Sequence, residues 1–198
     1  YKQLFIEGKL RTRDKIFETH CFHTDLLNAL GYNGPKNNYN DLFHLSEEDV
    51  IPVRHILHRG DQIHLMIMEM QALIKEDENE PDGLFEQSYN VEDETQTYPP
   101  QRYHRLQWEK VFKVPDDVKI SPTVINKIIS ELFLIEPHLR PKYILLLAGN
   151  VAFLLEQEKW FRGSYLQFDI EELFSEATAN RTANYYALFY FLVGKEAL

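Results

Sequence analysis

The chain has 198 residues, of which 44% are hydrophobic and 26% charged, and its formal net charge is −10. A chain of this size can bury one substantial core, so we expect residues 1–198 to form a single domain. The one cysteine, Cys21, excludes an internal disulfide framework and favours a reducing, cytoplasmic location. No apolar run approaches the roughly 18 residues that a membrane helix needs, so we expect no membrane partner. The start at Tyr1 and the helical pattern before Leu198 lead us to expect a fragment of a longer protein.

The negative charge is concentrated in residues 76–98, which hold nine acidic residues and no Lys or Arg. Removing these nine from 31 acidic residues leaves 22 against 21 basic ones, so the rest of the chain is close to neutral. We expect a solvated, mobile acidic segment at 76–98. An alternative is a strip that competes with nucleic acid for a basic surface. Neither the whole chain nor the chain without residues 76–98 has the excess of basic residues that is typical of a dedicated DNA-binding module.

In the first half of the chain, apolar spacing predicts a helix over residues 13–31. Residues 41–49 could form a short helical turn. Two β-like runs follow, at 50–57 and 63–74, and the turn between them contains Gly60, which is typical of a β-hairpin.

The second half begins with a helix that opens at Pro122 and closes at Pro137, because its apolar residues repeat at helical spacing. Three strands are then expected, from the aliphatic runs at 142–148 and 151–155 and a shorter run at 165–168. Two further helices are expected, at 170–176 with Asp169 as its cap and at 182–197. Helices and strands in this order indicate a mixed α/β fold.

Polar side chains follow the apolar run Leu65–Met68, at the expected end of its strand. Glu69 and Gln71 lie two residues apart, so both side chains project from the same face of the strand. A divalent-metal nuclease carries Glu-x-Lys at such a strand end. Here a glutamine stands in place of the lysine.

This pattern, followed by the run Tyr143–Gly149, resembles the PD-(D/E)xK nuclease fold, and specifically the N-terminal domains of type I restriction subunits. The stretch Lys159–Phe174 resembles the N-terminal region of long restriction–modification and phage-defence proteins, which carry an adenine-specific DNA methyltransferase downstream. The resemblance implies an α/β, restriction-endonuclease-like fold with a mixed central sheet flanked by helices. It also implies DNA and a downstream methyltransferase domain as partners.

Two departures from the nuclease pattern affect the expected site. The family places a metal-binding Asp about 14 residues before the Glu, where this chain has His55, and the lysine position holds Gln71. Mg²⁺ prefers oxygen ligands, and a neutral amide cannot replace an ammonium group beside phosphate. We therefore expect a degenerate site with no bound cofactor. If the site is active, we expect Mg²⁺-dependent phosphodiester hydrolysis at Glu69, with Gln71 and either His55 or the substitute metal ligand Asp61 assisting.

Strand geometry leaves the position of His55 open. A two-residue turn at Gly60-Asp61 would place His55 and Glu69 on opposite faces of the hairpin, whereas a three-residue loop or a bulge would bring them to the same face. His20 and His23 share one side of the first helix, but no zinc motif accompanies them, so we expect no structural zinc.

Four basic residues near the start of the chain are candidates for contacts with DNA phosphates: Lys9, Arg11, Arg13 and Lys15. Ordinary solubilising charge is the alternative interpretation. The second hypothesis for the whole chain is a domain that binds only other proteins, because this function fits the net negative charge of the chain.

Overall fold

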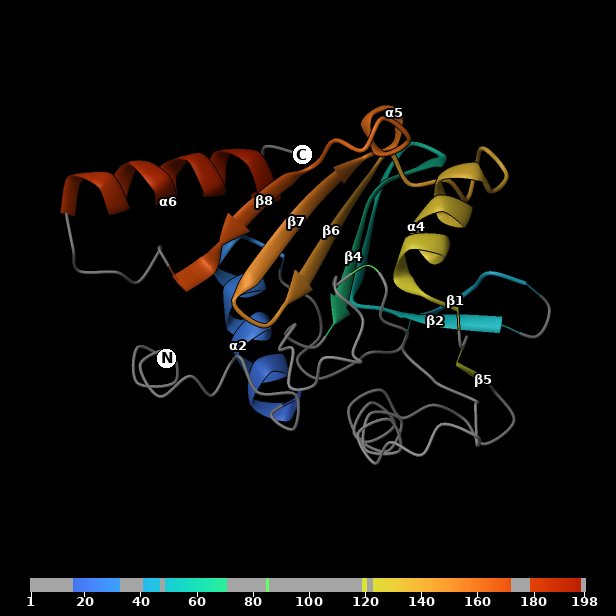
Figure 1. Ribbon diagram of the computed structural model, residues 1–198, viewed down its shortest axis with the longest axis horizontal. Coiled ribbons are helices and arrows are strands. Elements are labelled where there is room, and N and C mark those ends of the chain that lie inside the picture. Colours follow the sequence, from blue (N-terminus) through green and yellow to red (C-terminus); the bar gives the residue numbers. More distant parts are fainter. Residues whose placement is uncertain are drawn as a thin grey trace.

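The computed structural model describes residues 16–32, 41–46, 49–70, 85, 119–120, 123–171 and 179–196. These residues form a mixed α/β architecture with a five-stranded sheet in the order β3-β4-β6-β7-β8 and a three-stranded sheet in the order β1-β2-β5 (Figure 1). The strands are β1 (Asp41–His44), β2 (Asp49–Val53), β3 (His55–Arg59), β4 (Gln62–Met70), β5 (Lys119–Ile120), β6 (Tyr143–Ala148), β7 (Val151–Glu156) and β8 (Leu166–Asp169). The helices are α2 (Ile16–Ala29), α4 (Ile125–Leu134), α5 (Gln157–Trp160) and α6 (Ala179–Val193).

Strands β4 and β6 form the parallel centre of the larger sheet, and antiparallel strands flank them. Both strands are buried along most of their length, which explains their nearly continuous apolar sequences. A parallel pair needs a crossover connection, and α4 lies in the segment that joins them.

Opposite faces of the sheet pack against different helices. On one face Met66 and Met68 of β4 belong to a cluster with the buried residues of α4. Those residues repeat at helical spacing, as the sequence predicts: Ile125, Ile128, Ile129, Leu132 and Phe133. On the other face Leu65 and Ile67 pack with α2 and with Phe189 of α6. Figure 1 shows α4 beside β4 and α6 beside β8.

Two expectations for residues 41–57 are wrong. The short helical turn is a strand instead, because β1 pairs antiparallel with β2. The run at 50–57 is interrupted at Arg54, since β2 joins the small sheet whereas β3 joins the large one. The expected hairpin between β3 and β4 is confirmed, with Gly60 at a φ of 62° in its turn.

A β-bulge between Leu57 and His58 sets the register of this hairpin. Beyond the bulge His55 lies opposite Ile67, so His55 is on the same face of the sheet as Glu69. The bulge therefore selects one of the two arrangements that the sequence left open.

Two hydrogen bonds join the end of α6 to the residues that follow α2. The Tyr32 hydroxyl donates a 2.7 Å hydrogen bond to the carbonyl oxygen of Val193, and the Lys195 amide donates to the carbonyl of Leu30 at 3.0 Å. Ahead of α6, the Asp169 carboxylate accepts a 2.9 Å bond from the Glu171 amide, as a capping residue would. Most of the helix expected at 170–176 lies outside the described residues.

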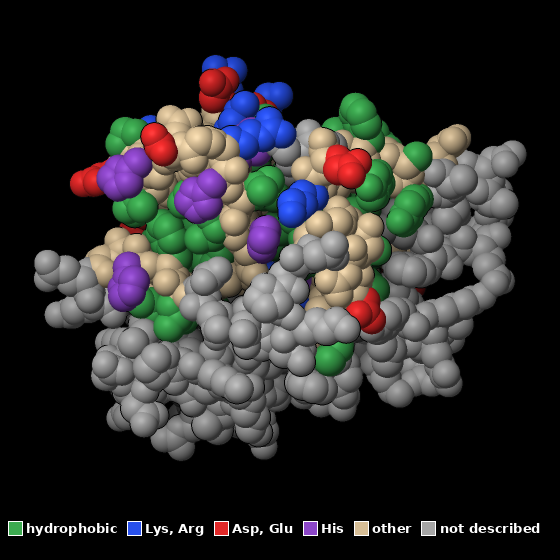
Figure 2. Space-filling model, turned by 180° about the vertical axis from the view of Figure 1, so that it is seen from behind, with side chains coloured by type: hydrophobic (Ala, Val, Ile, Leu, Met, Phe, Trp, Pro, Cys, Tyr) green, Lys and Arg blue, Asp and Glu red, His purple; other side chains and the backbone are tan. Residues whose placement is uncertain are grey.

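The surface of the described part is mixed in character. Figure 2 shows Lys and Arg side chains next to Asp and Glu side chains at its upper edge, with histidines and hydrophobic side chains over the face below. On α6 the side chain of Phe191 is 71% exposed and that of Leu188 is 50% exposed, whereas Phe189 is buried. Exposed apolar residues that stand singly are common, and only a large contiguous apolar patch marks a contact surface.

Candidate functional site

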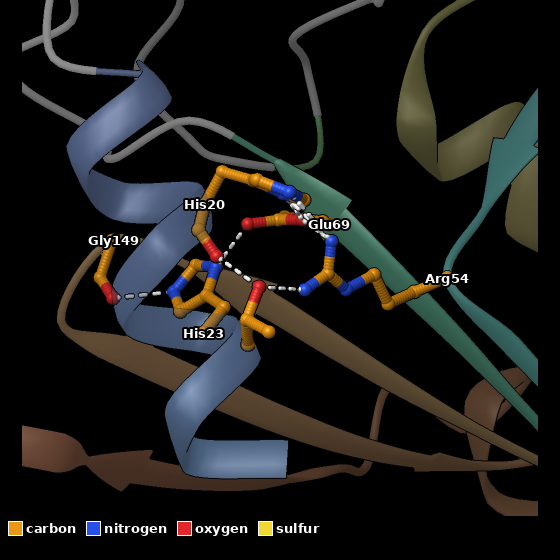
Figure 3. Close-up of polar contacts among 6 residues, drawn as sticks. His20, His23, Arg54, Glu69 and Gly149 are labelled. Carbon is orange, nitrogen blue, oxygen red and sulfur yellow. Dashed lines mark hydrogen bonds and ion pairs between the residues drawn. The ribbon is translucent and has the colours of Figure 1, made fainter. Parts of the chain in front are cut away.

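Glu69 is the centre of a buried polar cluster at the end of β4 (Figure 3). Its side chain is 2% exposed and faces α2, because odd-numbered residues of β4 project to that side of the sheet. A carboxylate this deeply buried requires partners that replace water.

Two histidines of α2 supply those partners. His20 Nδ1 lies 3.2 Å from Glu69 Oε2, and His23 Nδ1 lies 2.6 Å from Glu69 Oε1. The two histidines are three residues apart in the helix, so their side chains lie on the same face. Each carboxylate oxygen therefore contacts one imidazole ring.

Arg54 completes the cluster from the break between β2 and β3. Its backbone amide donates to the Ile67 carbonyl at 2.7 Å, which fixes its position beside β4. Its guanidinium Nη1 lies 3.7 Å from Glu69 Oε2, 2.7 Å from His20 Nδ1 and 3.0 Å from His20 Nε2. Nη2 donates to the hydroxyl of Thr24, which in turn donates to the His20 carbonyl at 2.8 Å.

The partners of His23 determine where its protons lie. His23 Nε2 is 2.8 Å from the carbonyl oxygen of Gly149, and a carbonyl only accepts, so Nε2 carries a hydrogen. On the other side of the ring a single proton lies between Nδ1 and Glu69. With Glu69 ionised, that proton is on Nδ1 and His23 is an imidazolium cation.

His20 contacts both of its charged neighbours. Its Nδ1 lies 3.2 Å from Glu69 Oε2 and 2.7 Å from Arg54 Nη1, and its Nε2 lies 3.0 Å from the same Nη1. Because Nη1 is close to both ring nitrogens, these contacts do not select one tautomer of His20. His20 therefore lies between the guanidinium and the carboxylate of the cluster.

The electrostatic balance favours the ionised carboxylate. Burial alone would raise the pKa of Glu69, but the positive charge of His23 and the hydrogen bonds from His20 and His23 outweigh burial and hold the pKa below its usual value. Burial lowers the pKa of Arg54 to about 10, with a smaller opposing contribution from Cys21, so the guanidinium stays charged at neutral pH.

This cluster does not fit a divalent cation. Among the described residues, the two cations Arg54 and His23 face the one anion Glu69, and this balance disfavours a divalent cation. Both oxygens of Glu69 already contact donors, whereas Mg²⁺ needs several free oxygen ligands. Within the described part of the chain, no group of three or more His, Cys, Asp and Glu side chains is arranged to hold a metal.

The structure describes two of the other residues expected at the site, His55 and Asp61. His55 shares the face of Glu69, but its ring packs edge-on against Tyr32 at a centroid distance of 5.7 Å. Asp61 is exposed at the hairpin turn, eight residues from Glu69 along the strand direction, a separation of roughly 26 Å at about 3.3 Å per residue. Asp61 and Glu69 therefore cannot share one metal ion, which corrects that pairing.

Several site residues that the sequence predicts lie outside the described residues. These are Gln71, the basic residues Lys9, Arg11, Arg13 and Lys15, and the acidic segment 76–98 apart from Phe85. Their roles remain predictions.

Sequence reasoning missed the partners of Glu69. The spacing of His20 and His23, which places both side chains on one face of α2, is the signal in the sequence for these partners. Nothing local marked Arg54, because its role depends on the strand break that carries it to Glu69.

No family model, curated protein or solved structure matches this chain. Among the described residues, no helix is both long enough and apolar enough to cross a membrane.

Proposed function

We propose that this chain is a nuclease-like domain of a DNA restriction–modification or defence protein, and that it serves as a scaffold or DNA-proximal interaction module without cutting DNA. The observation that carries the proposal is the state of Glu69. At the position where a nuclease would hold its metal, both carboxylate oxygens are bound by histidines and a buried arginine lies beside them. The residues instead tie α2 to the central sheet.

The mixed sheet supports the nuclease-like part of this proposal. Glu69 lies on a central strand, in the hairpin that precedes helix α4, as the sequence resemblance implies. A downstream methyltransferase domain and DNA are the partners that this family would supply. A mixed-sign surface fits weak DNA contact made together with other domains rather than tight binding by this domain alone.

Cleavage is tested by incubating the purified 198-residue chain with supercoiled plasmid and Mg²⁺ or Mn²⁺. We expect neither the unaltered chain nor a Glu131→Gln control, which alters an exposed carboxylate on α4, to nick the plasmid more than a reaction without protein. Nicking by the unaltered chain that disappears in Glu69→Gln, while the control still nicks, would show an active Mg²⁺-dependent endonuclease and reject the proposal.

A protein-interaction domain with no role on nucleic acid is the second candidate, favoured by the exposed Leu188 and Phe191 on α6. Salt-dependent binding to DNA separates the two. Contacts from Lys9, Arg11, Arg13 and Lys15 should weaken steeply as salt rises and be lost when all four become glutamine. Binding that is absent at every salt concentration would favour the second candidate.

A further inference from the structure

We draw no further inference here: the strongest candidate, the exposed apolar face of α6 that Tyr186, Leu188, Tyr190 and Phe191 form, carries no proposal because nothing in the described part of the chain shows what covers it.

Discussion

Removing the charge of Glu69 is the most informative perturbation of the polar cluster. Glu69→Gln keeps the shape of the side chain but leaves the charges of Arg54 and His23 without their anion in a buried site. Breaking a buried ion pair by removing one partner costs about 3–5 kcal/mol. We expect the lower end, about 3 kcal/mol, because His23 can lose its proton and accept a hydrogen bond from the new amide.

Thermal unfolding followed by circular dichroism at pH 7 measures this cost. For a chain of this length 1 kcal/mol shifts Tm by about 2–4 °C, so Glu69→Gln should lower Tm by about 6–12 °C. The matched control is Glu131→Gln, which removes a carboxylate that is 46% exposed and paired with Lys127 on the surface of α4. Its Tm should change by no more than about 2 °C. An unchanged or higher Tm for Glu69→Gln would refute the ionised cluster.

The pH dependence gives a second check on the same residue. The pKa of Glu69 is lower in the folded chain than in the unfolded chain, so its contribution to stability is complete above the unfolded value of about 4.3. That contribution is lost as pH falls through the lowered folded pKa. The difference in unfolding free energy between the unaltered chain and Glu69→Gln should therefore shrink in strong acid. A difference that stays constant down to pH 2 would contradict the ionised state.

The remaining predictions concern the junction of α2 and α6 and one glycine of the hairpin. Tyr32→Phe should lower the unfolding free energy by about 1–2 kcal/mol, because it removes the hydroxyl that donates to the Val193 carbonyl. Burial raises the pKa of Tyr32, so the unaltered chain should lose stability above about pH 10, where the phenol of the unfolded chain ionises. A series of denaturation measurements at increasing alkaline pH tests both expectations. Gly194→Ala should destabilise the chain more than Gly60→Ala in urea unfolding, because a Cβ at Gly194 would lie 2.5 Å from the Tyr190 carbonyl oxygen. A Cβ at Gly60 would meet no other atom within 4 Å, so only the positive φ of this residue disfavours the substitution. Equal midpoints for the two alanine variants would disprove the steric reasoning.

Local patterns determined several elements of this fold. The apolar spacing of Ile125, Ile128 and Ile129 marks one face of α4, since that face repeats every 3.6 residues and must be buried. The aliphatic run of β6 and the glycine turn before β7 predict a buried hairpin, because both strands are covered on two faces. Glu69 was also identifiable as the polar end of an apolar strand.

Long-range packing decided the chemistry of the candidate site. His23 is 46 residues from Glu69 and 126 from Gly149 along the chain, and no local pattern encodes either contact. The bulge in β3 and the break at Arg54 depend on which sheet each short strand joins. A lone carboxylate in the sequence is compatible with metal binding or with an ion pair, and its charge environment is created only when α2 packs against β4.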